Sequence, residues 1–291
     1  MQFRILGTLE ARKAGERLPL GGHGDQKLLA VLLLEANRVV PVTRLVEVLW
    51  DDGPPGSAVK QVRNAVSRLR RLFAASGEPG AIVTDGGGYR LVVPDGALDT
   101  AVFESQVARA GALACAGDAA QAAGLLRSAL DLWRGPALAG LPGRVFEAAA
   151  AAWDERRCAA AEMYFDCQLL LGRHREVLGE LWALAADYPL RAGPVGQLML
   201  ALYRCGRQAD ALALYSKTRM LLAEEVGLDP GPVLQHLHQQ ILTASPALTA
   251  PPPANGHPPG RPRGAGGLRQ AALPGRCQSR REPARGRRRH T

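Results

Sequence analysis

The sequence predicts a mainly α-helical chain with folded domains at 1–95 and 96–245 and a disordered tail at 246–291. Its 291 residues are enough for two hydrophobic cores. In the first domain, short β-forming runs flank three helical stretches, and from Asp99 onward apolar residues recur at helical spacing almost without interruption. Beyond Ser245 the composition changes to Pro, Gly, Arg and Ala, which cannot form a packed core.

The first domain begins with β-forming residues at Phe3–Arg12 and Arg17–Leu20, which indicate a small antiparallel sheet. The next run, Asp25–Ala36, is apolar and free of Gly and Pro, so it predicts a first helix at the centre of the core. Thr43 is a start signal for a second helix over Arg44–Trp50.

A third helix and a hairpin complete this domain. Two prolines and two glycines exclude a helix over Asp51–Gly56, and Ser57 then suits the N-cap of a helix that runs to Ala75. The β-forming runs Ile82–Thr84 and Tyr89–Val93 stand on either side of an Asp-Gly turn, which predicts a hairpin. A small sheet, three helices and a β-hairpin wing, in this order, predict a winged helix-turn-helix.

The third helix has two different faces. Its apolar residues are spaced three and four apart and form one stripe toward the core: Val59, Val62, Val66, Leu69 and Phe73. A polar stripe lies on nearly the opposite side and contains Lys60, Asn64, Ser67 and Arg71, with Arg68 at its outer edge and Arg63 and Arg70 nearer the core. No acidic residue occurs between Ser57 and Ala75, so nothing on this helix repels phosphate.

Such a helix fits the major groove of DNA, where Arg, Lys and Asn side chains can read base edges. We assign base or near-base contact to the N-terminal part of the helix, at Lys60, Arg63, Asn64 and Ser67. Phosphate contacts that set the register are assigned to Arg68, Arg70 and Arg71, and Arg90 of the hairpin suits the minor groove or a phosphate. The alternative is a solvated amphipathic helix whose charges only confer solubility, and the two preceding helices and the following hairpin favour the DNA-binding interpretation.

The net charge of +9 resides in the tail. Residues 244–291 hold ten Arg and one acidic residue, so residues 1–243 are balanced, with 26 basic and 26 acidic side chains. Such a polycationic segment would add affinity for any DNA by releasing counterions, without adding sequence information. The alternative is an evolutionary remnant with no role, and the sequence does not decide between the two.

The second domain contains an internal repeat. Helices fit 100–116, 119–134, 144–171, 173–187, 195–205, 207–226 and 231–243. Gly172-Arg-His-Arg-Glu-Val-Leu178 aligns with Gly206-Arg-Gln-Ala-Asp-Ala-Leu212 at a spacing of 34 residues, and Gly117–Ala122 is a degenerate third copy. A period of 34 residues is that of tetratricopeptide repeats, so we predict an all-α domain of that type.

Several classes of function find no support. The chain lacks a phosphate-binding loop of the form Gly-x-x-x-x-Gly-Lys-Ser/Thr, and no nucleophilic or metal-binding constellation can be assembled, so we expect no enzyme, no cofactor and no metal site. Neither a signal peptide nor a membrane-spanning run is present, and the five cysteines form no Cys-x-x-Cys pair. We therefore expect a cytoplasmic protein with reduced thiols.

Taken in order, several motifs resemble the Streptomyces antibiotic regulatory protein family. In the first domain they are the run from Arg38 to Trp50, Val66-Ser-Arg-Leu-Arg-Arg71 and Gly88-Tyr-Arg-Leu91. The second domain resembles that family's bacterial transcriptional activation domain in Trp133-Arg-Gly-Pro-Ala-Leu138, in the two repeat motifs, and in Glu224–Gly231. The winged helix is similar to that of OmpR-type regulators. The tail resembles no domain, and Lys60–Ala65 is less typical of the family than the residues after it.

The resemblance implies an activator of a secondary-metabolite (antibiotic) gene cluster that binds direct repeats in double-stranded DNA near the −35 region of a promoter and recruits RNA polymerase. It implies two copies side by side on DNA as a homodimer, with the Asp51–Gly56 loop facing polymerase. No membrane is expected as a partner. The runner-up is a helical-repeat adaptor whose winged helix contacts protein and does not read DNA.

Overall fold

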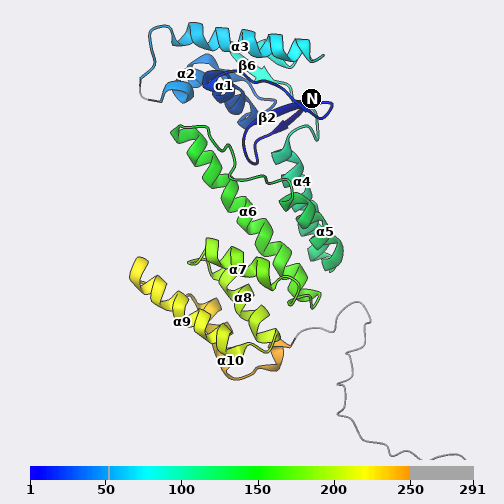
Figure 1. The fold of residues 1–291 in the computed structure, drawn as a ribbon, viewed down its shortest axis with the longest axis vertical. Helices are drawn as coiled ribbons and strands as arrows, with labels where there is room; N and C mark the ends of the chain where they lie inside the picture. The colour runs from blue at the N-terminus through cyan, green and yellow to red at the C-terminus, as the bar shows by residue number, and fades with distance from the viewer. Residues whose placement is uncertain (52, 250–291) are drawn as a thin grey trace, which may run out of the picture. The chain divides into compact units, whose positions relative to one another are not determined.

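A computed structural model describes residues 1–51 and 53–249 (Figure 1). It confirms the predicted mainly α fold, in which a small-sheet winged helix region is followed by a helical region (Figure 1). Within the described residues, no helix is both long and apolar enough to cross a membrane. Residues 250–291, which make up most of the predicted disordered tail, lie outside the described residues.

The N-terminal region combines two small antiparallel sheets with three helices. Its elements are β1 (Gln2–Arg4), β2 (Glu10–Lys13), β3 (Glu16–Arg17), α1 (His23–Leu34), β4 (Val40–Pro41), α2 (Val42–Trp50), α3 (Ala58–Ala75), β5 (Ile82–Asp85) and β6 (Gly88–Leu91). The first sheet has the order β1-β2-β3, and the second has the order β4-β6-β5. The predicted helices and hairpin are present, with ends shifted by up to two residues.

Helix α1 is the centre of the first hydrophobic core. Every residue from Leu28 to Leu33 is buried, although these positions cover all sides of a helix. A helix that is apolar all round is stable in water only when other elements enclose it. Helices α2 and α3 both pack against α1, and Phe3 of β1 and Phe73 of α3 join the same core with their rings edge to face.

The wing hairpin depends on three consecutive glycines. Gly86 and Gly87 both adopt positive φ, at 50° and 84°, which a two-residue turn of this hairpin requires and which only glycine adopts without strain. Gly88 serves a different purpose, because β6 also pairs with β4 there. A Cβ atom at Gly88 would lie 2.3 Å from the carbonyl oxygen of Val40, so a side chain would separate these two strands.

The C-terminal region is helical throughout. Its elements are α4 (Asp99–Cys115), α5 (Ala119–Leu130), α6 (Arg144–Leu170), α7 (Leu178–Asp187), α8 (Ala192–Arg204), α9 (Gln208–Glu225), α10 (Pro232–Leu242) and the short 3-10 helix η1 (Pro246–Leu248). The largest departure from prediction is the start of α7, expected at residue 173. Gly172 ends α6 with positive φ, and the next residues form a separate turn in which Glu176 N–H donates to Arg173 O at 3.1 Å.

The three aligned glycines of the predicted repeat occupy the same backbone position. Gly117, Gly172 and Gly206 each follow a helix and have φ of 86°, 74° and 78°. In every copy the residue after the glycine donates its N–H group to the carbonyl oxygen five positions before that residue, which provides a partner for a carbonyl at the helix end. The repeat seen in the sequence therefore reflects a repeated helix ending.

Each of the two regions buries side chains from the other in its hydrophobic core. Leu138, Leu141 and Phe146, from the segment before α6 and its first turn, are buried in the core around α1, and Leu6 is buried in the core of the helical region. The carboxylate of Asp99 accepts hydrogen bonds from the backbone N–H groups of Ile5 and Leu6 at 2.9 Å. Desolvation raises the pKa of Asp99, and these backbone hydrogen bonds oppose part of the rise.

The folded part extends past Ser245, where the sequence places the start of the tail. Leu248 of η1 is 5% exposed, and the Arg204 guanidinium donates to its carbonyl oxygen at 3.0 Å and to that of Leu169 at 2.8 Å. These two hydrogen bonds attach η1 to α8 and α6. The first residues of the predicted tail therefore belong to the core of the helical region.

Candidate nucleic-acid interface

Helix α3 rests on a continuous buried stripe, as its spacing predicts. The buried residues are Ala58, Val62, Ala65, Val66, Leu69 and Phe73. Val59 was predicted in this stripe, but it is 43% exposed. It lies at the edge of the stripe in the first helical turn, and Ala58 and Ala65 are buried in its stead. Ser57 precedes the helix without a side-chain cap, and its hydroxyl accepts a hydrogen bond from Gln61.

The opposite face of α3 presents unpaired donors. Lys60, Arg63, Asn64 and Arg71 are exposed, and within the described residues none of them makes a hydrogen bond or ion pair through its side chain. Ser67, also exposed, donates its hydroxyl to the carbonyl oxygen of Arg63 at 3.0 Å. The structure thus brings the predicted central positions together on one solvent-facing surface. We call this surface, made of Lys60, Arg63, Asn64, Ser67 and Arg71, the α3 face.

Arg68 lies on one flank of the α3 face and is held by α1. Its guanidinium donates to both carboxylate oxygens of Asp25, with Nη2 2.6 Å from Oδ1 and Nε 2.9 Å from Oδ2. Asp25 is 6% exposed, whereas the Arg68 side chain is 50% exposed. The hydrogen bond to Asp25 raises the pKa of Arg68. Gly21 makes room for this pair, because a Cβ there would lie 2.7 Å from Oδ2 of Asp25.

Arg70 lies on the other flank and attaches α3 to the wing. It donates from Nε to the carbonyl oxygen of Ile82 at 3.0 Å and from Nη2 to the hydroxyl of Thr84 at 2.7 Å. Its guanidinium also lies 5.7 Å from the centre of the Tyr89 ring. On the hairpin itself, Arg90 is 3.6 Å from the carboxylate of Asp85 and 38% exposed. The contacts of Arg70 attach the wing to α3, whereas the pair of Arg90 and Asp85 lies within the wing.

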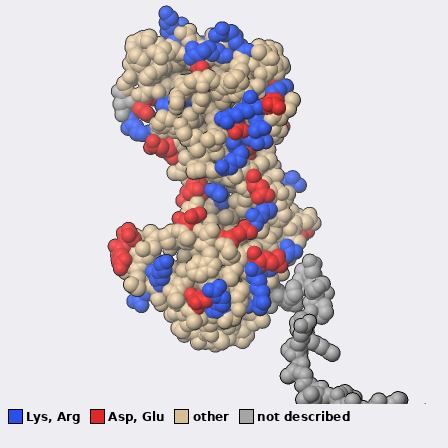
Figure 2. Space-filling model, in the orientation of Figure 1, with Lys and Arg blue, Asp and Glu red and all other residues tan. Residues whose placement is uncertain are grey.

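Positive charge therefore gathers along α3 with little acid nearby. Figure 2 shows Lys and Arg side chains along the edge that α3 occupies in Figure 1. The carboxylate of Asp25, which contacts the helix through Arg68, is buried and neutralised by that arginine. A phosphate that approaches the α3 face meets cations and an amide with no competing anion on the helix.

Residues that position this surface were not found from the sequence. Asp25 lies 43 positions from Arg68, and Thr84 lies 14 positions from Arg70, so no local pattern joins either pair. The available signal was that Asp25 shortly precedes the continuous apolar run Leu28–Leu34 of α1, because an acid buried beside such a run requires a partner. Within residues 1–51 and 53–249, no group of three His, Cys, Asp or Glu side chains is arranged to hold a metal ion.

Two family models match the chain. The model described as "Transcriptional regulatory protein, C terminal" matches residues 20–91, which contain α1 to β6 and the α3 face. The "Bacterial transcriptional activator domain" model matches residues 98–242, which contain α4 to α10. The two matches follow one another in the order of the winged and helical regions.

Curated relatives match across both regions. The chain is 43% identical over 249 residues to the regulatory protein AfsR of Streptomyces coelicolor, a match that covers 85% of this chain and 25% of AfsR. The chain therefore spans about a quarter of the length of AfsR. It is 36% identical over 257 residues to the regulatory protein DnrI of Streptomyces peucetius, which covers 85% of this chain and 94% of DnrI.

A solved structure has the same fold. It is EmbR of Mycobacterium tuberculosis in complex with a low-affinity phosphopeptide, with a TM-score of 0.82 and 34% sequence identity. The match covers 84% of this chain and 65% of the EmbR chain. Like AfsR and DnrI, EmbR is named among the curated relatives as a regulatory protein, here a transcriptional one.

Proposed function

We propose, from the premise that the chain belongs to the Streptomyces antibiotic regulatory protein family of transcriptional regulators, that it activates a secondary-metabolite gene cluster by reading promoter DNA with α3. The observation that carries this proposal is the α3 face. Four of its five side chains, all except that of Ser67, have no partner within the described chain, although the two arginines on its flanks are both engaged. Donors held on a rigid helix without internal partners are available to bases and phosphates.

The contacts divide by position on the helix. Lys60, Arg63, Asn64 and Ser67 occupy the N-terminal half of α3, which enters the major groove deepest in helix-turn-helix proteins, and they are assigned to base or near-base contact. Arg71 follows one turn later and binds phosphate. Arg68, Arg70 and Arg90 are half-exposed, so each can reach a phosphate with its outer nitrogen while its internal contact holds the side chain in place.

The helical region, residues 96–245, is assigned to protein contact. Members of the family with both regions are regulators, and an activator must touch the transcription machinery as well as DNA. We assign RNA polymerase as that partner, in the cytoplasm, with two copies of the chain on direct repeats. Asp51, the first residue of the loop proposed to face polymerase, lies 4.0 Å from Arg144 of α6, so this loop and the helical region adjoin.

The proposal is tested with the full chain and DNA from upstream of its neighbouring biosynthetic genes. In a gel shift at fixed salt, we expect a fragment with direct repeats to be bound more tightly than a fragment of equal length with scrambled repeats. A reporter behind the same promoter should respond to the chain. Equal binding to both fragments, together with an unresponsive reporter, would contradict the proposal.

A further inference from the structure

One apolar side chain of α3 lies outside the core. Val59 is 43% exposed, and it belongs neither to the core around α1 nor to the partly buried side chains that pack against that core. Within α3, all of which the structure describes, it is the one large apolar side chain exposed to this degree. Single exposed hydrophobic residues are common on protein surfaces, so this exposure matters only because of the place where it occurs.

Val59 lies in the first turn of α3, at the edge of the α3 face. With 3.6 residues per turn, Arg63 lies about 40° from Val59 around the helix axis, and Ser67 lies about 80° from it in the same direction. The buried Val66 lies about 20° from Val59 in the opposite direction. Val59 therefore extends the α3 face with an apolar group, on the flank where Arg70 attaches the helix to the wing.

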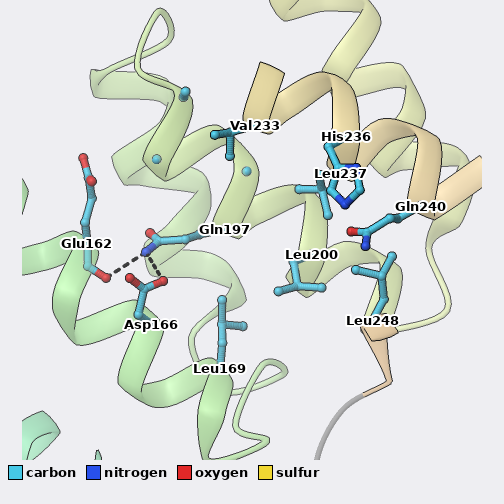
Figure 3. Close-up of a pocket in the computed structure, with 13 residues that line it drawn as sticks. Glu162, Asp166, Leu169, Gln197, Leu200, Val233, His236, Leu237, Gln240 and Leu248 are labelled. Atoms are coloured by element: carbon cyan, nitrogen blue, oxygen red, sulfur yellow. Dashed lines mark hydrogen bonds between the residues drawn. The ribbon is translucent and has the colours of Figure 1, made fainter. Parts of the chain in front are cut away.

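A cavity of about 570 Å³ in the helical region, between α6, α8 and α10, differs from the α3 face in the state of its polar groups (Figure 3). The amide of Gln197, which lines it, donates from Nε2 to the carbonyl oxygen of Glu162 at 2.7 Å and to Oδ1 of Asp166 at 2.6 Å (Figure 3). These bonds join α8 to α6. The amide is therefore engaged within the helical region, whereas the polar side chains beside Val59 are available to DNA.

Polar and apolar side chains recognise different parts of a base pair. In the major groove, Arg and Asn form hydrogen bonds with the edges of guanine and adenine, whereas thymine is the base that presents a methyl group. The first turn of a recognition helix lies deepest in the groove, where the base edges are. Val59 occupies that turn and offers no hydrogen bond, so the group that it matches on a base edge is the thymine methyl.

We propose that Val59 packs on the methyl group of a thymine in each direct repeat and so makes that thymine part of the sequence specificity. The inference rests on the proposed function, because it requires α3 to lie in the major groove. Contact removes the exposed valine methyls and the thymine methyl from water, which is favourable. Side chains one helical turn apart are about 5–6 Å apart and base pairs about 3.4 Å apart, so the thymine lies within about two base pairs of the position that Arg63 reads.

The test measures the affinity of the full chain, by fluorescence anisotropy at fixed salt, for operator DNA in which each thymine in turn is replaced by deoxyuridine. This replacement removes the methyl group and keeps every hydrogen-bonding group of the base pair. At one thymine of each repeat we expect the wild-type chain to bind about three- to fivefold more weakly, the effect of one buried methyl group. Val59→Ala should bind the unmodified operator at least as weakly as that and should be insensitive to deoxyuridine at the same position.

Val92→Ala is the matched control, because Val92 is 41% exposed but lies beside Met1 and Glu78, outside the α3 face. It should keep the affinity and the deoxyuridine profile of the wild-type chain, and thermal unfolding reports whether each variant folds.

The same deoxyuridine profile in the wild-type chain and in Val59→Ala would overturn the inference, as would a wild-type profile without a sensitive thymine. In both cases a retained preference for operator over scrambled DNA would leave the proposed function standing. A wild-type chain that lacks this preference would contradict the proposed function and the inference together.

Discussion

The arginines of α3 fall into two groups that carry the same charge but differ in whether the side chain has a partner within the described chain. Arg63 and Arg71 project from the α3 face with no partner within the described chain, whereas Arg68 is bonded to Asp25 and Arg70 to the wing. A side chain without internal partners can rearrange to match a base edge. One that is already bonded has a fixed direction and adds charge at a fixed place. The two groups should therefore respond differently to substitution.

We expect Arg63→Ala and Asn64→Ala each to weaken binding to the operator by about 1–3 kcal/mol, the magnitude of a bidentate base contact. Arg71→Ala should instead weaken binding to all sequences alike and lower the slope of affinity against salt concentration by about one. Arg175→Ala, an exposed arginine of the helical region, serves as the control. Fluorescence anisotropy with operator and scrambled DNA measures both quantities, and unchanged operator affinity in both Arg63→Ala and Asn64→Ala would remove the base-contact assignment.

Arg68→Ala should lower the free energy of unfolding as well as DNA affinity. The substitution leaves the buried carboxylate of Asp25 without its donor, and lost hydrogen bonds to a charged group cost about 1.5–3 kcal/mol. Arg71→Ala, which breaks no internal bond, is the matched control. Urea unfolding of both variants gives the comparison. If Arg68→Ala is as stable as Arg71→Ala, the pair with Asp25 has no structural role.

At the scale of elements, the wing depends on one close approach. Gly88→Ala would place a methyl group 2.3 Å from the carbonyl oxygen of Val40. We expect this change to lower the free energy of unfolding by about 1–3 kcal/mol, the usual cost of overpacking. Gly80→Ala, in a position with open space and no positive φ, should change it by about 0.5 kcal/mol or less. Comparable urea midpoints for the two variants would show that β4 and β6 accommodate the added methyl group without a loss of stability.

Most elements could be predicted because their signals are local. The apolar period of α3, the Gly-rich turn of the hairpin and the glycines that end the repeats each lie within a few residues. The start of α7 could not be predicted, because residues 173–177 have helical composition but form a separate turn. For the candidate site, the exposed positions followed from helical spacing. The bond between Arg68 and Asp25 did not, because it joins residues 43 positions apart and depends on how α1 and α3 pack.

At the scale of the whole molecule, the hydrophobic core of the winged region includes side chains that come from outside this region. Phe146, in the first turn of α6, is 1% exposed in the core around α1, and Leu138 is 2% exposed there. The predicted boundary between residues 95 and 96 therefore separates α1 from side chains that cover it. A fragment of residues 1–95 would lose these contacts, so separation of DNA binding from activation is better tested with point substitutions in the full chain.

We expect Phe146→Ala to destabilise the chain by about 3–5 kcal/mol, as for other buried aromatic residues, and to lower operator binding although the residue lies outside the winged region. Leu170→Ala changes the last residue of the same helix, which is 67% exposed, and should alter stability by about 0.5 kcal/mol or less. Thermal unfolding monitored by circular dichroism distinguishes them. An unchanged melting temperature for Phe146→Ala would mean that the winged region folds independently of α6.

The claim that α3 reads DNA is tested most directly by measuring affinity for an operator and for every single base-pair variant of it. For the wild-type chain we expect penalties of about 1–3 kcal/mol at a few positions in each direct repeat. Arg63→Ala should abolish the penalty at one position and keep the others, whereas Arg71→Ala should keep the whole pattern at lower affinity. A flat profile for the wild-type chain, or the same profile change in both variants, would contradict base reading by α3.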